Sequence, residues 1–496
     1  MTTADLADCA IQRGRKQVSA KISSTTFGVI VICLVLCLTT TNLIMADTPE
    51  GLDIVFIVDQ SGSMGGEEAG CTKHPVPNDP NGMRFYGVQY AAEWLGRNQW
   101  LIHPDVTYQV AVVNFGSQAR AVNLGTSEAP RNWETISPGS ETEWLLQQAT
   151  LRPKLKPRGL DSRHMGDTNF LRAFRVARDL FAQLDDEGDS PSNHRRAIVV
   201  LTDGQPYVDA EGFTESNHME GVLALTEESF PASDYDIYVV AMNDAEAHYW
   251  DRTYAGYWAD VTGDSDRAQK VRLNETDVGI RFREILLELT HDLPGEFQVE
   301  DIEIEAGPQV IPPYLAEVEF TFFKAKSDET TTITDALGRD VKSLGENAGV
   351  KVSGETGPIE SVSVSNPEPG RWVVGVPVGS DTKITMQKIP ARGVLEKPSS
   401  VQYRHLPTEI VYQLGDIHGN PLPAYSDPTY QLQVTATMEV NGQSWPINLR
   451  LNGQSRYEGE FVPSTTGSHV VYVEAVSQDL SGKRIEVFAG KLNPFE

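Results

Sequence analysis

Short apolar runs that alternate with segments of helical periodicity constrain the fold of this chain more than any other feature. The runs lie at 52–59, 108–115, 197–203 and 235–242. They are rich in β-branched residues and apolar almost throughout, as expected of strands buried on both faces. Apolar residues recur at steps of three and four over 85–95, 170–184 and 278–289. Strands alternating with helices predict an α/β fold with a doubly wound parallel sheet, within a domain that spans residues 50–293.

After Leu293 the apolar period changes from helical to two, as in Val318, Phe320 and Phe322. Alternation of this kind, with turn residues at regular intervals, predicts half-buried antiparallel strands in two all-β sandwich domains. A Pro- and Gly-containing break separates the two predicted domains, at 296–395 and 400–496. The second, which contains the run HVVYVEAV, resembles bacterial surface immunoglobulin-like domains.

The amino end carries one long uncharged apolar run, residues 27–46, after a basic segment at 1–26. The run reaches the ~20 residues of a spanning helix only by including several Thr and Asn residues. We therefore expect either a cleaved signal peptide or a retained membrane anchor. In both cases residues 1–26 stay cytoplasmic and the rest of the chain is extracytoplasmic, either membrane-anchored or secreted.

Composition limits the function classes. At ~150 residues per domain, 496 residues correspond to about three folded units. The formal net charge of −28 makes nucleic acid an unfavourable partner, because its phosphates would be repelled. Of the four cysteines, only Cys71 follows the apolar run, so the exported part cannot form an internal disulfide.

Oxygen-bearing side chains gather where the predicted strands end. Asp59, Ser61 and Ser63 follow the first strand, and Asp203 follows a later one. Residues two apart in a loop leaving a strand point the same way, so the first three can converge. Thr168, just before a predicted helix, adds a hydroxyl. Ligands of doubly wound sheets bind at this edge, and hard oxygen donors suit Mg²⁺ or Ca²⁺.

The residues from about 50 to 293 resemble a von Willebrand factor A domain in motif order and content. The resemblance implies a metal-ion-dependent adhesion site, in which one divalent cation is held by the five matching positions, Asp59, Ser61, Ser63, Thr168 and Asp203. The segments 65–82 and 117–165 are longer than such a domain needs. Both are expected to lie near or beside the predicted metal site, where they would affect ligand specificity.

The predicted cation is Mg²⁺, with Ca²⁺ or Mn²⁺ as alternatives. Two aspartates and three hydroxyls leave it incompletely coordinated, so a Glu or Asp of a partner protein can replace a water. The predicted function is therefore metal-dependent protein binding or adhesion outside the cytoplasm. The alternative is a membrane-anchored scaffold subunit of an envelope assembly complex, in which the same site holds a permanent partner.

Other interpretations have less support. Asp59, Ser61 and Ser63 are also common turn residues, but Thr168 and Asp203 occur in the expected order. Cys71 and His74 have the spacing of half a zinc site, without a second pair. The chain lacks HExxH, GxSxG, a Walker-type loop and a GxGxxG after a strand, so we expect no enzyme activity.

Overall fold

The computed structural model describes the chain in segments between residues 50 and 495. These are 50–65, 79, 82–101, 106–125, 129–136, 167–187, 193–204, 206–209, 212–242, 255–271, 275–291, 293, 300–397, 405–415, 421–422, 433–440, 443–452, 456–462, 469–478 and 484–495. None of the helices in these segments is both long and apolar enough to span a bilayer. The predicted cytoplasmic segment 1–26, the predicted signal or anchor at 27–46, and Cys71 and His74 lie outside the described residues.

A seven-stranded sheet forms the centre of the amino-terminal α/β unit, with six strands in the order β3-β2-β1-β5-β6-β7 and β4 also paired to β2. Its strands are β1 (Gly51–Asp59), β2 (Thr107–Phe115), β3 (Ala119–Ala121), β4 (Trp133–Ile136), β5 (His194–Thr202), β6 (Tyr235–Met242) and β7 (Ala268–Val271). The predicted strands therefore form, and β1, β2, β5, β6 and β7 run parallel.

The prediction of a purely parallel sheet is wrong at one edge. β3 and β4 both pair antiparallel with β2, so the sheet is mixed. Both strands lie in the stretch that the sequence predicted as a long loop. Pairing them with β2 satisfies backbone groups that an exposed edge strand would leave open.

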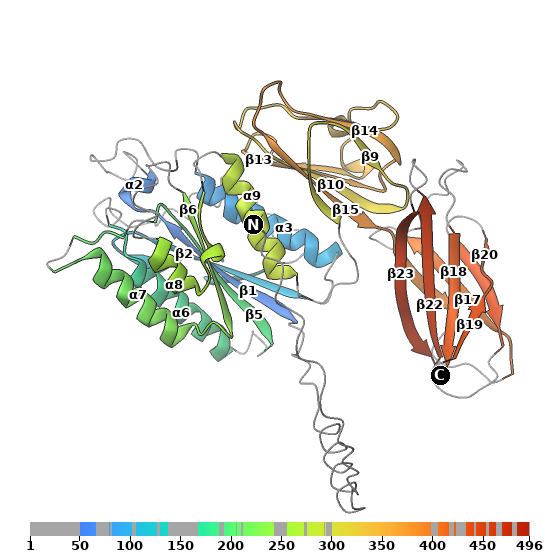
Figure 1. The fold of residues 1–496 in the computed structure, drawn as a ribbon, viewed down its shortest axis with the longest axis horizontal. Helices are drawn as coiled ribbons and strands as arrows, with labels where there is room; N and C mark the ends of the chain where they lie inside the picture. The colour runs from blue at the N-terminus through green and yellow to red at the C-terminus, as the bar shows by residue number, and fades with distance from the viewer. Residues whose placement is uncertain are drawn as a thin grey trace, which may run out of the picture. The chain divides into compact units, whose positions relative to one another are not determined.

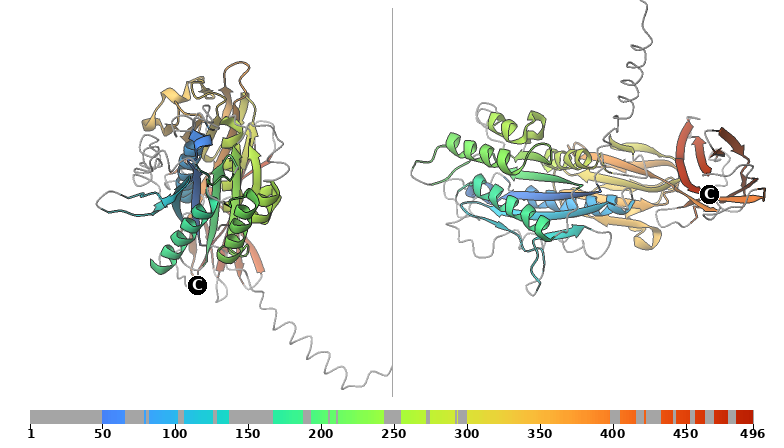
Figure 2. Two further views of the ribbon diagram at one scale, coloured as in Figure 1. Left: turned by 90° about the vertical axis from the view of Figure 1, so that its left-hand side faces the viewer. Right: turned by 90° about the horizontal axis from the view of Figure 1, so that it is seen from below.

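Helices cover both faces of this sheet, as the α/β pattern predicted (Figures 1 and 2). α3 (Met83–Leu101) and α9 (Glu275–Thr290) pack on one face, where Phe56 of β1 meets Phe282. The other face is covered by α6 (Phe170–Glu187), α7 (Glu215–Ser229) and α8 (Ala255–Thr262). β1 is buried along its whole length, because its alternate side chains enter these two cores.

The chain then forms two antiparallel sheets that share one core. The larger has the order β12-β13-β10-β15-β8 and the smaller β11-β14-β9. Phe320 of the larger sheet stacks on Trp372 of the smaller, with ring centroids 6.0 Å apart. The strands are β8 (Glu300–Ile304), β9 (Gly307–Ile311), β10 (Leu315–Phe323), β11 (Thr332–Thr334), β12 (Val350–Ser353), β13 (Ile359–Ser365), β14 (Gly370–Gly375) and β15 (Lys383–Pro390).

A second pair of four-stranded antiparallel sheets follows, with the orders β16-β17-β21-β20 and β19-β18-β22-β23. Its core joins Tyr412 of one sheet to Ala436 and Val473 of the other. The strands are β16 (Arg392–Lys397), β17 (Thr408–Gly415), β18 (Gln433–Val440), β19 (Gln443–Ile447), β20 (Arg450–Leu451), β21 (Arg456–Phe461), β22 (His469–Gln478) and β23 (Arg484–Phe495).

The expectation of half-buried strands is wrong for β10, which is buried on both faces. Its second face lies against helices α3 and α9 of the α/β unit. Phe323 meets Tyr90 edge to face at 5.7 Å, and Glu319 forms an ion pair with Arg97. Period-two alternation signals one solvent-exposed face, and here other elements of the same chain cover that face.

We expect Gly279→Val to weaken this contact. A Cβ atom at Gly279 would lie 2.2 Å from the ring of Phe323, so the ring or helix α9 must shift. Overpacking of this kind should reduce the free energy of unfolding by about 1–3 kcal/mol in urea titration. Gly256→Val in α8 is the matched control, because no atom lies within 4 Å of its added Cβ. Equal effects of the two substitutions would contradict the packing described for α9.

Glu317 on β10 gives a pH-dependent prediction. Burial, and then the charge of Glu319, raise the pKa of Glu317 to about 7 from 4.5, against the opposing effect of Arg97. The stabilising contribution of Glu317 is complete below pH 4.5 and is lost as the pH rises through 7. Glu317→Gln should therefore raise the free energy of unfolding by up to about 3 kcal/mol at pH 8 and have little effect at pH 4.5. A gain that is the same at both pH values would refute this.

Candidate functional site

The candidate site lies where the strand order of the α/β sheet reverses. β1 is central, with β2 on one side and β5 on the other. Connections leaving β1 and β5 diverge at this switch point, which opens a crevice at the carboxyl ends of the strands. The amide of Gln60 donates to the carbonyl of Phe115 at 2.7 Å, so the loop leaving β1 is held against the end of β2.

Asp59, the last residue of β1, has no solvent exposure. Its Oδ1 accepts a hydrogen bond from the backbone N–H of Ser61 at 2.7 Å. Its Oδ2 accepts one from the hydroxyl of Thr202 at 2.7 Å, and that hydroxyl accepts from the amide of Gly204 at 3.0 Å. The carboxylate is thus fixed from both β1 and β5.

The two predicted serine ligands lie together. The hydroxyl oxygens of Ser61 and Ser63 are 3.2 Å apart. This separation is close to the roughly 3 Å expected between adjacent ligands of an octahedral Mg²⁺ with bonds of about 2.1 Å. Ser63 belongs to the one-turn helix α2 (Gly62–Gly65), which the amide of Met64 closes by donating to the carbonyl of Ser61 at 3.1 Å.

Thr168 is brought to the same edge by its backbone. Its amide donates to the carbonyl of Tyr207 at 2.7 Å, and the amide of Tyr207 donates back at 3.2 Å. The next amide, of Asn169, donates to the carbonyl of Gly116, just after β2. Thr168 is only 3% exposed. Its loop is therefore tied both to the end of β2 and to the segment that follows Asp203.

Asp203 places a second buried carboxylate near Asp59. It is 4% exposed and directly follows β5. Burial and the negative charge of Asp203 raise the pKa of Asp59 to about 7, although the hydrogen bonds from Thr202 and Ser61 oppose this. Two carboxylates that repel each other away from water gain most from a cation between them.

The donor set fits a hard cation. Within the described segments, no group of three or more His, Cys, Asp and Glu side chains has the arrangement of a metal site. Two aspartates supplemented by hydroxyls instead suit an ion that keeps part of its water shell, as Mg²⁺ does. The structure thus brings together the strand ends and loops that carry all five predicted residues, while their role as metal ligands stays a prediction.

The loop that carries the serines is braced by a buried ion pair. Asp79 caps α3 by accepting from the amide of Met83 at 2.7 Å, and it pairs with Arg84 at 2.6 Å. Arg84 also donates to the carbonyl of Met64 at 3.4 Å. The start of α3 is therefore anchored to the end of the candidate site loop.

Two residues that support the candidate site, Thr202 and Tyr207, were not predicted from the sequence. Thr202 orients Asp59, and Tyr207 holds Thr168 through paired backbone hydrogen bonds. The position of Thr202 directly before the predicted ligand Asp203 could have indicated its role, because it places a hydroxyl at the end of the strand. Tyr207 acts through its backbone, and backbone pairing does not depend on the type of side chain, so no sequence feature indicated its role.

Comparisons with known proteins do not assign a family. No protein-family model matches the chain, and no curated protein does. Among solved structures, the pilus adhesin SpaC from Lactobacillus rhamnosus GG is 13% identical, with a TM-score of 0.33 over 88% of this chain and 54% of that one. Manganese-loaded TRAP protein of Plasmodium vivax is 11% identical, with a TM-score of 0.27 over 52% of this chain and 85% of that one.

This chain therefore spans about half the length of the SpaC chain. At these scores the similarity carries no argument about activity, metal or partner.

Thr202→Val should test the support of Asp59. The substitution keeps the shape of the side chain but removes the hydroxyl that donates to Oδ2 of the buried carboxylate. Leaving that acceptor without its partner should cost about 1–3 kcal/mol of unfolding free energy, measured by urea titration. Thr226→Val in α7 is the control, because that hydroxyl donates only to the carbonyl of Leu223 in its own helix. A loss no larger than in the control would show that Thr202 does not hold Asp59.

Proposed function

We propose that the α/β unit is a von Willebrand factor A-type domain that recognises a protein partner through a divalent cation. The observation that carries this proposal is the convergence of Asp59 and Asp203, both buried, with the paired hydroxyls of Ser61 and Ser63. A site that served only to close a turn would gain nothing from a second buried carboxylate beside Asp59.

Mg²⁺ is the proposed ion. Asp59, Ser61, Ser63, Thr168 and Asp203 would hold it, directly or through water. With two carboxylates and three neutral hydroxyls, the ion retains affinity for a further anionic oxygen. When bound, the cation would supply the positive charge that a Glu or Asp side chain of the partner completes.

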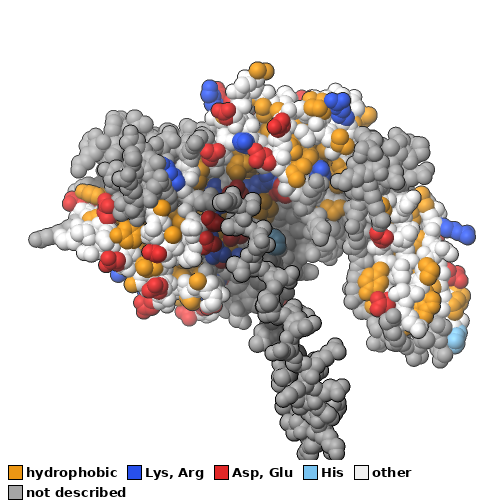
Figure 3. All heavy atoms as spheres, viewed as in Figure 1, with side chains coloured by type: hydrophobic (Ala, Val, Ile, Leu, Met, Phe, Trp, Pro, Cys, Tyr) orange, Lys and Arg blue, Asp and Glu red, His pale blue; other side chains and the backbone are white. Residues whose placement is uncertain are grey.

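The surrounding charge shapes how such a partner approaches. The chain carries a net charge of −28, and exposed acidic side chains lie over α6 and α7 (Figure 3), including Asp185, Asp186, Glu227 and Glu228 at the helix ends farther from the candidate site. An acidic partner is repelled at long range, so recognition would depend on the cation at short range. Removing the cation should then abolish binding outright, because only repulsion would remain.

We further propose that the protein acts outside the cytoplasm, anchored by or released from residues 27–46, with the β units as spacers. The function would be adhesion through reversible binding of a partner. A permanent partner would instead make the protein a scaffold subunit. Reversible, chelator-sensitive capture of a purified partner would favour adhesion, whereas a native complex that resists chelator would favour the scaffold.

The double substitution Asp59→Ala with Ser61→Ala tests the site directly. We expect Mg²⁺ binding, measured by isothermal titration calorimetry on residues 47–496, to be lost in this variant. Asp209→Asn is the control, because Asp209 is an exposed carboxylate in the segment that follows β5 and is not one of the five proposed ligands. Circular dichroism should first establish that the double variant is folded. Unchanged Mg²⁺ affinity in a folded double variant would show that the assignment is wrong.

A further inference from the structure

The two β units of the chain meet without a linker. The first β unit comprises β8 to β15 and the second comprises β16 to β23. β15 ends at Pro390 and β16 begins at Arg392, so only Ala391 lies between them. Ala391 has no solvent exposure and belongs to the core of the second β unit. Flexible boundaries between domains usually consist of exposed residues with few contacts, whereas this boundary is one buried residue.

Tyr314 crosses the same boundary from another part of the chain. It lies in the short connection between β9 and β10 of the first β unit, yet its side chain belongs to the core of the second. Two further tyrosines of that core, Tyr412 and Tyr457, have ring centroids 6.3 Å apart. Burial, and then the nearby phenol of Tyr314, raise the pKa of Tyr457. Tyr314 is only 6% exposed, so almost all of its side chain is enclosed at this boundary.

The backbone of Tyr314 has a conformation that a bulky residue rarely adopts, with φ of +61°. Such a conformation persists only where the surrounding structure enforces it. The carbonyl of Tyr314 accepts a hydrogen bond from the amide of Ala391 at 2.9 Å. Pro312 and Pro313, which are both buried, precede Tyr314 and restrict the approach of the backbone. The two segments that cross the boundary are therefore bonded to each other.

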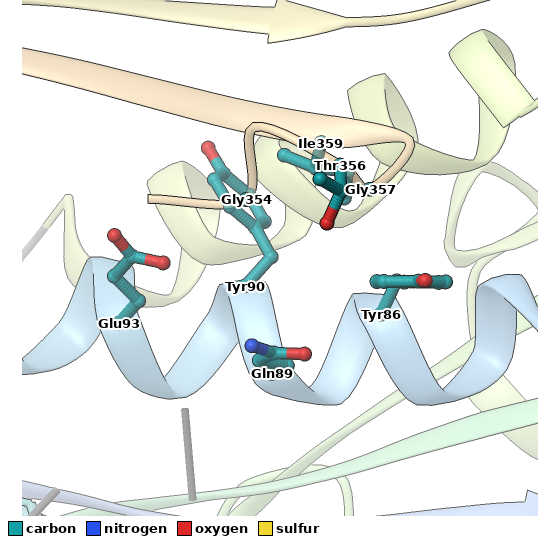
Figure 4. A pocket seen from close by; sticks show the side chains of 8 residues that line it. All are labelled: Tyr86, Gln89, Tyr90, Glu93, Gly354, Thr356, Gly357 and Ile359. Atoms are coloured by element: carbon teal, nitrogen blue, oxygen red, sulfur yellow. The ribbon is translucent and has the colours of Figure 1, made fainter. Parts of the chain in front are cut away.

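Strand β10 continues this connection to the α/β unit. It follows Tyr314 directly, and its far end packs against α3, where Phe323 meets Tyr90. Figure 4 shows Tyr86, Tyr90 and Glu93 extending from α3 toward the turn that joins β12 to β13 of the first β unit. The first β unit is thus in contact with the α/β unit on one side and with the second β unit on another.

We infer that Tyr314 fixes the angle between the two β units, so that they move as one rigid body. Rotation of one unit against the other would pull the ring of Tyr314 out of the second core and expose apolar surface to water. It would also break the hydrogen bond between Tyr314 and Ala391. The β units would then form a spacer of constant length, and this inference does not depend on the proposed cation site.

Pulsed electron–electron double resonance between two nitroxide labels tests the inference on residues 47–496. Cys71→Ser removes the native thiol of this segment. Labels are attached at Leu337→Cys in the first β unit and at Gln443→Cys in the second, because both positions are exposed. A pair within the first β unit, Leu337→Cys with Val378→Cys, gives the width that the labels alone contribute. We expect the two distance distributions to have similar widths.

Substitutions at Tyr314 separate the ring from the hydroxyl. Tyr314→Gly should broaden the distribution between the units by about twofold or more, because the inserted ring is lost. Glycine adopts a positive φ without strain, so this variant spares the connection itself. Tyr314→Phe keeps the ring and should leave the distribution narrow. Phe461→Ala is the matched control, because it removes an aromatic ring that packs against the same core from β21, and it should not change the width.

Two results would overturn the inference. One is a distribution between the units that, in the unsubstituted protein, is already more than about twice as wide as the distribution within the first β unit. The other is an unchanged width in a Tyr314→Gly variant that circular dichroism shows to be folded. Neither result bears on the proposed Mg²⁺ site, because no divalent cation is added and Tyr314 lies outside the α/β unit.

Discussion

One buried carboxylate, that of Asp59, organises the candidate site at the carboxyl ends of the strands in the α/β unit. Asp59 is satisfied by an amide from its own loop and by a hydroxyl from the neighbouring strand β5. This places the first of the predicted ligands at the end of β1, a central strand that is buried along both faces. Side chains that folding has already fixed lose little conformational entropy when a ligand binds. Most of the entropy needed to order this site is therefore lost during folding and not during binding.

The α/β architecture could be predicted because its main strands are continuous apolar runs and its main helices carry periodic apolar residues. The run at 52–59 matches β1 within one residue, and the stripe from Phe170 to Leu184 lies within α6. α7 was not predicted, because its buried residues Met219, Val222 and Leu225 are interrupted by polar neighbours. The antiparallel strands β3 and β4 were missed because pairing to a sheet edge leaves little trace in segments of three and four residues.

Residue types and their order along the chain were enough to predict the five candidate ligands. They were not enough to predict the residues that hold those ligands in place. Thr202 and the backbone partner Tyr207 depend on how separate segments meet, which local sequence does not encode. The same limit applies to β10. Its alternation predicted one face open to water, whereas Glu317 and Glu319 on that face are buried against α3 and α9. Charged residues at alternate positions usually indicate a solvent-exposed face, and only the ion pair of Glu319 with Arg97 in the folded structure shows otherwise.

The ion pairs of Arg97 with Glu319 on β10 and of Arg283 with Asp301 on β8 also affect how this architecture can diversify. Buried charge pairs contribute modestly to stability, because desolvation offsets their attraction, but they penalise any mismatched surface heavily. A different β unit attached behind this α/β unit would leave Arg97 and Arg283 without counter-charges. Neither unit can therefore be replaced by an unrelated domain without leaving buried charges unpaired. Substitutions at this contact must change both partners of an ion pair together.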